Sequence, residues 1–186
     1  MSEEQTIQTP LWVQELDKYK ASKPIEDVAA DLGLKPEDII MLVANENPNG
    51  MSDKVKEAVS KAVFSLNRYP DADSYHLQKA IAEKYGVPQD WVVIGSGSSE
   101  LLGLAAQTVL SVGTTAIYPQ YSFSLYPMVA RLCGAETIEV PATGDYNADL
   151  QAMLDAIDSR TRLIFLTNPN NPTGTYLAEN DILQFL

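Results

Sequence analysis

The stretch Trp91-Val92-Val93-Ile94-Gly95-Ser96-Gly97-Ser98-Ser99-Glu100 decides the fold class of this chain. Its apolar start predicts a short buried strand, and the glycines and serines that follow predict a tight loop opening a helix. The same alternation continues downstream, with strands expected at 114–118, 137–140 and 163–166 and helices at 124–132, 149–157 and 178–186. Strands that alternate with helices of roughly ten residues indicate an α/β domain with a largely parallel sheet.

Upstream of this stretch the pattern is helical and less regular. A helix is expected over residues 11–19, and another begins after Pro24 and ends near Gly33. Ser52 can cap a helix through about residue 66, and Asp73 or Ser74 can cap one that Gly86 closes. Serine or aspartate at the start and glycine at the end are the usual helix boundaries.

Composition narrows the possible partners of the chain. The 186 residues are 45% hydrophobic and carry a formal net charge of −12. This acidic balance argues against general binding to nucleic acid or to an anionic membrane. No apolar run approaches the roughly 20 residues of a membrane span, and the polar N-terminus lacks a signal core, so a cytoplasmic location is expected. Cys133 is the single cysteine and reads as a packed small hydrophobe at a helix end.

Ser98 and Ser99 stand at the expected N-terminus of a helix that follows a strand. The first N–H groups of a helix have no internal partner and attract anions, so these residues predict a phosphate cradle. A serine acting only as a helix cap is the alternative. A dinucleotide site is disfavoured, because Glu100 occupies the place of the third glycine of that fingerprint.

A second loop, Asn168-Pro169-Asn170-Asn171-Pro172-Thr173-Gly174, follows the last expected strand. Ligands of open α/β sheets collect at the carboxyl ends of strands, where both loops are expected. An asparagine there could donate a hydrogen bond to a phenolate-like oxygen, although turn structure alone could also explain the residues. The residues by themselves therefore predict a phosphate site with an amide nearby, and they nominate no catalyst.

Taken together, these motifs resemble those of the histidinol-phosphate aminotransferases, which are pyridoxal-phosphate (PLP) enzymes. The similarity covers roughly residues 15–186 and rests on segments in the family's order: 44–50 (ANENPNG), 66–71 (LNRYPD), 97–100 (GSSE), 123–127 (FSLYP) and 168–174 (NPNNPTG). The resemblance implies PLP fold type I, in which residues 1–45 contribute to a small domain and residues 46–186 form part of a large α/β domain.

The resemblance also implies roles for particular residues. Ser98 and Ser99 would bind the PLP phosphate, Phe123 would stack on its ring, and Asn171 would hydrogen-bond its phenolic oxygen. Tyr69 would reach the PLP phosphate of the partner subunit in a homodimer. Family members commonly have Asp at the position of Ser99, which leaves the backbone contact but changes the side-chain contacts. Core packing is the alternative for Phe123, and a turn anchor is the alternative for Tyr69.

Three further residues, Tyr19, Asn45 and Glu46, are implied near the substrate. The substrates would be a phosphorylated amino compound, histidinol phosphate, and a 2-oxo acid, 2-oxoglutarate, in histidine biosynthesis. A PLP-dependent decarboxylase of a phosphorylated amino acid shares these motifs and stays open, as does a non-catalytic remnant that binds phosphate compounds.

The catalytic residue itself is not found in the sequence. PLP enzymes need a lysine for the Schiff base, and the resemblance implies one about 40–60 residues beyond Asn171, past Leu186. No lysine present matches the family's motif. We therefore expect that this polypeptide is a piece of a longer chain, that it has no transaminase activity alone, and that it is poorly soluble.

Overall fold

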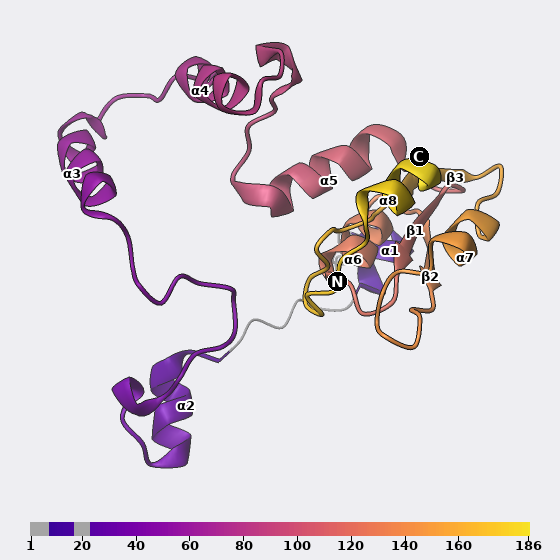
Figure 1. Ribbon diagram of the computed structural model, residues 1–186, viewed down its shortest axis with the longest axis horizontal. Helices are drawn as coiled ribbons and strands as arrows, with labels where there is room; N and C mark the ends of the chain where they lie inside the picture. The colour runs from indigo at the N-terminus through magenta and orange to yellow at the C-terminus, as the bar shows by residue number, and fades with distance from the viewer. Residues whose placement is uncertain (1–7, 17–22) are drawn as a thin grey trace, which may run out of the picture. The chain divides into compact units, whose positions relative to one another are not determined.

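The computed structural model describes residues 8–16 and 23–186, which form two compact units. One unit contains the chain up to residue 18 together with residues 90–186, and the other contains residues 19–89. Figure 1 shows the sheet of the first unit with helices on both of its faces. The expected helix over residues 11–19 begins as α1 (Leu11–Gln14), and its last residues, Tyr19 among them, lie outside the described ranges.

The sheet has three parallel strands in the order β2-β1-β3. They are β1 (Thr115–Pro119), β2 (Glu136–Val140) and β3 (Thr161–Ile164). The central strand is buried along its whole length, because it has a neighbour on each side and helices on each face. The predicted α/β class with a parallel sheet is confirmed.

Alternate residues of β1 supply two separate cores. Ala116 and Tyr118 face a cluster built with α5 (Gly97–Val109) and α6 (Leu125–Leu132). Ile117 faces the opposite way, into a cluster with Met153 of α7 (Leu150–Asp155) and with Phe185 at the end of α8 (Glu179–Phe185). The strand period of two therefore places one helical layer on each side of the sheet.

The strand expected at residues 91–94 is absent from the structure. Gln89–Trp91 forms a 3-10 turn, and the residues that follow are irregular up to α5. Trp91 is 73% exposed and Val93 is 67% exposed. An apolar run becomes a strand only where a neighbouring strand offers its backbone, and the three-stranded sheet of the described residues does not extend to this run.

The unit of residues 19–89 is built from α2 (Ile25–Leu32), α3 (Asp53–Ala62) and α4 (Tyr75–Tyr85), with 3-10 turns at 36–38 and 63–65. Most predicted boundaries hold: Gly33 and Gly86 end their helices with left-handed backbone, and the Ser52 hydroxyl accepts the N–H of Val55. The start of α4 differs from expectation. Ser74 occupies the cap position, but the carboxylate of Asp71 accepts the N–H of Tyr75 at 2.8 Å.

Helix α1 packs against a segment that is distant in sequence, the turn that follows α6. Gly134 has a φ of +77°, and a Cβ there would stand 2.8 Å from the Val112 side chain and 3.2 Å from the Trp12 ring. Only glycine fits this close approach. Within the described residues no helix is long and apolar enough to cross a bilayer.

Candidate active site

Three loops meet at the carboxyl edge of the sheet, one after each parallel strand. The N–H of Gln120, just after β1, donates to the carbonyl of Val140 at 2.8 Å. The Asn170 side-chain amide donates to the carbonyl of Tyr121 at 3.0 Å, and the Thr175 hydroxyl donates to the carbonyl of Tyr146 at 3.1 Å. The edge at which the sequence predicted a ligand site is thus a connected surface.

The N-terminus of α5 offers unpartnered donors. Ser98 and Ser99 occupy the first turn and are exposed, and among the described residues their N–H groups have no acceptor. Gly97 precedes them with a φ of +78°, and nothing lies within 4 Å of the place where a Cβ would stand. The carboxylate of Glu100 is turned back onto the N–H of Ser96, so it acts as a structural hydrogen-bond acceptor and keeps its charge on the loop.

Phe123 lies between β1 and α6, where its ring takes part in an aromatic column. The ring meets Tyr126 edge-on at 5.8 Å, and Tyr126 stacks on Phe165 with ring centroids 4.6 Å apart. The Tyr126 hydroxyl is hydrogen-bonded to that of Thr167. Phe123 is half-buried against the α5–α6 core, so packing already uses part of its surface. The core role weighed for this residue therefore has direct support.

Tyr121 is a residue that the sequence reasoning missed. It lies in the same loop, is 51% exposed and has a φ of +56°. Its ring meets that of Tyr146 edge-on at 5.4 Å. A non-glycine residue in left-handed backbone is uncommon and clusters at functional sites. The available signal was an aromatic residue immediately after the end of a buried strand.

The asparagines of the loop after β3 divide into two groups. Both polar atoms of the Asn168 amide are hydrogen-bonded to the backbone of Leu177. Nδ2 donates to the Leu177 carbonyl at 3.1 Å, and Oδ1 accepts from the Leu177 N–H at 2.8 Å. Asn170 is used as a donor to Tyr121 and to Thr173. The half-buried Asn171 makes none of these bonds, so its amide remains available to a ligand.

The other predicted site residues belong to the unit of residues 19–89. Tyr69, Asn45 and Glu46 are all exposed, and Tyr69 is fully so. Asn45 has a φ of +54°, and the turn beside it is held by Asn47, whose side chain accepts the N–H of Asn49 at 3.0 Å. The structure leaves these three side chains exposed.

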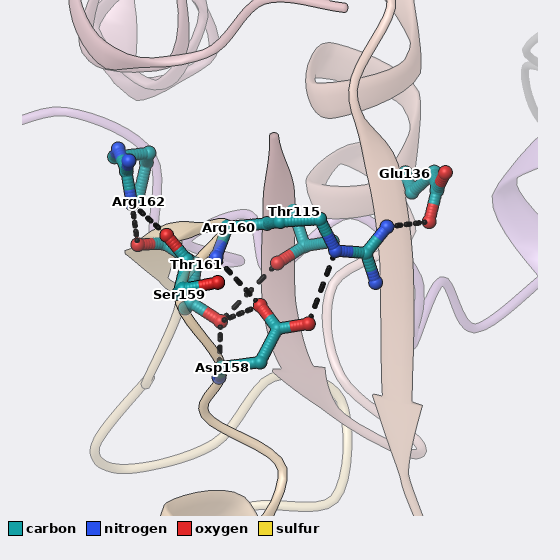
Figure 2. A network of polar contacts seen from close by, with 7 residues as sticks. All are labelled: Thr115, Glu136, Asp158, Ser159, Arg160, Thr161 and Arg162. Carbon is teal, nitrogen blue, oxygen red and sulfur yellow. Dashed lines mark hydrogen bonds and ion pairs between the residues drawn. The ribbon is translucent and has the colours of Figure 1, made fainter. Parts of the chain in front are cut away.

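The opposite, amino edge of the sheet carries a saturated polar network (Figure 2). Arg160 donates to Glu136 at 2.8 Å and to Asp158 at 3.1 Å, joining the start of β2 to the turn before β3. The Thr115 hydroxyl donates to that of Thr161 at 3.2 Å. The N–H of Arg160, followed by its guanidinium, holds the pKa of Asp158 below its ordinary value. Arg160, Asp158 and Glu136 each have an oppositely charged protein partner in this network.

The residues at the start of α5 and in the loop after β3 fit the phosphate and the phenolic oxygen of PLP. Two free N–H groups with two hydroxyls at a helix N-terminus suit a phosphate, and the open space at Gly97 allows close approach. The unused amide of Asn171 suits an ionised oxygen. The stretch 90–186 contains no lysine, so a Schiff-base residue is not supplied by this part of the chain. No cluster of possible metal ligands occurs within the described ranges.

The parallel three-stranded sheet between two helical layers is shared with solved aminotransferases of PLP fold type I. The sequence profile of class I and II aminotransferases matches residues 37–186, and the chain belongs to this family.

Within the family, the chain is a homologue of histidinol-phosphate aminotransferases. It is 42% identical over 177 residues to histidinol-phosphate aminotransferase 2 of Nitrosospira multiformis, covering 95% of this chain and 45% of the relative. It is 44% identical to histidinol-phosphate aminotransferase 1 of Cupriavidus pinatubonensis, covering 95% and 47%. The chain thus spans a little under half the length of the curated relatives it matches.

The fold likeness extends over nearly the whole chain. The crystal structure of histidinol-phosphate aminotransferase from Sinorhizobium meliloti in complex with pyridoxal-5'-phosphate matches with a TM-score of 0.82 at 23% identity. The match covers 99% of this chain and 48% of that one.

Proposed function

We propose that the complete gene product is a cytoplasmic PLP-dependent aminotransferase that exchanges an amino group between histidinol phosphate and 2-oxoglutarate in histidine biosynthesis. The observations that support this proposal are the unpartnered N–H donors at the start of α5 and the unused amide of Asn171 in the loop after β3, which belong to the same compact unit. The similarity to histidinol-phosphate aminotransferases over 95% of the chain supports histidinol phosphate as the amino substrate.

In this proposal the chain's own residues bind and orient the cofactor. Ser98 and Ser99 donate backbone and hydroxyl hydrogen bonds to the phosphate, where the helix dipole adds favourable charge. Asn171 donates to the phenolic oxygen and favours its ionised form. Phe123 or the more exposed Tyr121 lies against the ring and sets its plane. When bound, PLP supplies the electron sink that labilises a bond at the substrate α-carbon.

The remaining residues act on the substrate and the partner. Tyr19, Asn45 and Glu46 contact the substrate, and Tyr69 donates its hydroxyl to the PLP phosphate of a second subunit in a homodimer. Residues 1–45 belong to a small domain and 46–186 to the large PLP-binding domain. The full exposure of Tyr69 supports its availability to another chain.

Cofactor titration of the complete gene product tests the proposal directly. We expect PLP to bind with micromolar or tighter affinity and histidinol phosphate to be consumed only when 2-oxoglutarate is present. Release of carbon dioxide from a phosphorylated amino acid, without dependence on the 2-oxo acid, would instead identify a decarboxylase. A protein that binds no PLP would defeat the proposal altogether.

Two substitutions decide which aromatic side chain lies against the ring. Tyr121→Leu and Phe123→Leu each remove one aromatic surface and keep an apolar group of similar bulk. The variant that lowers PLP affinity by about tenfold marks the stacking residue, since an aromatic stack contributes about 1 kcal/mol. The other variant should change the melting temperature more than the affinity.

The 186-residue polypeptide alone is expected to lack transaminase activity, because no lysine lies in the stretch 90–186 that carries the cradle. Its activity is measured beside that of the complete gene product under identical conditions. Turnover by the isolated polypeptide at a comparable rate would show that the reaction needs no further part of the protein.

A further inference from the structure

The side chain of Asn170 connects two of the loops at the carboxyl edge. Its Nδ2 donates to the carbonyl of Tyr121 at 3.0 Å and to the hydroxyl of Thr173 at 2.8 Å. Its backbone is fixed as well, because its N–H donates to Thr175 at 2.8 Å and its carbonyl accepts the N–H of Gly174 at 2.9 Å. Asn170 is thus held rigidly within its own loop while its amide reaches the loop after β1.

The orientation of this amide is fixed by the Tyr121 carbonyl, which can only accept a hydrogen bond. Asn170 Oδ1 is buried and has no hydrogen-bond partner among the described residues. Rotating the amide by half a turn would place Oδ1 against the carbonyl oxygen of Tyr121, where two acceptors repel. Asn170 Oδ1 therefore stays without a partner, which is unusual for a buried oxygen, while Nδ2 keeps its hydrogen bond to the Tyr121 carbonyl.

The bond from Asn170 is made to a residue with unusual backbone. Tyr121 has a φ of +56°, a left-handed conformation that non-glycine residues adopt only when their surroundings hold them. Holding its carbonyl therefore fixes the direction of the aromatic loop that contains both Tyr121 and Phe123. On the other side, Asn170 is peptide-bonded to Asn171, whose amide is unused.

We propose that Asn170 is a positioning residue that sets the spacing between the aromatic platform after β1 and the amide of Asn171, and so tunes PLP binding without touching the cofactor. This inference rests on the proposed function. The bond joins the group that would lie against the ring to the group that would meet the phenolic oxygen. Displacements of about 1 Å in such a pair weaken a site markedly.

Asn170→Asp is the sharpest test, because it keeps the shape of the side chain and replaces the donor by a carboxylate oxygen that the Tyr121 carbonyl repels. Asn168→Asp is the matched control. It makes the same chemical change in the same loop, at an amide that contacts only Leu177. Both variants are made in the complete gene product, as apo-protein, and PLP is the probe.

Three quantities are measured: the PLP dissociation constant, the visible circular dichroism of the bound cofactor and the melting temperature of the apo-protein. We expect Asn170→Asp to weaken PLP binding about tenfold and to change the dichroism, which reports the tilt of the ring. Asn168→Asp should leave both quantities near those of the wild type while lowering the melting temperature to a similar extent.

Equal losses of affinity in the two variants would show a general loosening of the loop and overturn the proposal, as would unchanged affinity and dichroism in Asn170→Asp. If Asn170→Asp does not fold, Thr173→Val replaces it, since this change removes one of the two hydrogen-bond acceptors of the amide. A smaller loss of affinity, about threefold, is then expected, and no loss would overturn the proposal.

Wild-type protein that binds no PLP would overturn the proposed function and this inference together, whereas wild-type binding with an unaffected Asn170→Asp overturns the inference alone.

Discussion

The polar side chains on the two sides of this unit differ in whether they have hydrogen-bond partners within the protein. At the amino edge, Arg160, Asp158 and Glu136 bond to one another, and each of these charges has a partner in the protein (Figure 2). On the side proposed for binding, Asn171 after β3 and the serines at the start of α5, Ser98 and Ser99, keep donors without protein partners among the described residues. The strands between them are only four or five residues long, so both edges share one scaffold.

This contrast separates stability from binding. A group with protein partners contributes to the free energy of folding whether or not a ligand is present. A group without partners contributes only when a ligand arrives, so its removal should lower affinity and leave the melting temperature nearly unchanged. The predictions below test whether the two edges are independent in this sense.

The largest effect is expected from Ile117→Ala, in the strand that both edges share. Ile117 is fully buried beside Met153, and its truncation leaves a cavity. We expect the free energy of unfolding to fall by about 3 kcal/mol. Chemical denaturation measures this value, and a loss below about 1 kcal/mol would mean that the core closes around the cavity.

Removing the two hydroxyls of the cradle should have a smaller effect, confined to binding. In the double variant Ser98→Ala, Ser99→Ala the backbone N–H groups remain, so PLP affinity should fall by about tenfold rather than vanish. The melting temperature of the apo-protein should stay within about 2 °C of the wild type, since neither side chain caps the helix. A large drop in melting temperature with unchanged affinity would reverse the roles assigned to the two edges.

Arg160→Gln tests the amino edge with a still smaller expected effect. The side chain is exposed, and exposed ion pairs contribute little to stability. A decrease in melting temperature of about 2 °C is expected at low salt and less at high salt, with PLP affinity unchanged. Weakened PLP binding in this variant would show that the edges are coupled through the strands.

The smallest effect concerns acid stability at the same edge. The pKa of Asp158 lies below its ordinary value because of the N–H and guanidinium of Arg160, so its contribution is complete above about pH 4 and is lost as the pH falls through the lower folded-state pKa. As the pH falls below about 4, the melting temperature of the wild type should therefore decrease more steeply than that of Asp158→Asn. Parallel curves for the two proteins would contradict this assignment.

The sequence predicted those features that depend on local patterns. The run around Ile117, the cap at Ser52 and the glycine ends of the helices follow from side-chain periodicity and backbone preference, and all are present. The strand expected at 91–94 is not, because a strand depends on a neighbour that no local pattern reveals. The helix N-terminus at Ser98 and Ser99 was foreseen for the same local reasons, although the strand predicted to precede it is absent.

The sequence could not predict which asparagines of the loop after β3 are hydrogen-bonded within the protein and which one is left without a partner. Asn168, Asn170 and Asn171 have the same chemistry, and only the fold shows that the first two are used within the protein. Tyr121 is likewise more exposed than Phe123 because only the Phe123 ring packs against the core between α5 and α6. Which residue of a motif remains free is decided by tertiary contacts.

The docking of α1 has a consequence for the order in which the protein is made. Trp12 leaves the ribosome early, but the glycine against which it packs, Gly134, is synthesised only after the whole unit of residues 19–89. Contacts between residues so distant in sequence form late and slow the folding of the unit they complete. During synthesis the first helix therefore has no binding surface until the chain has been made as far as Gly134.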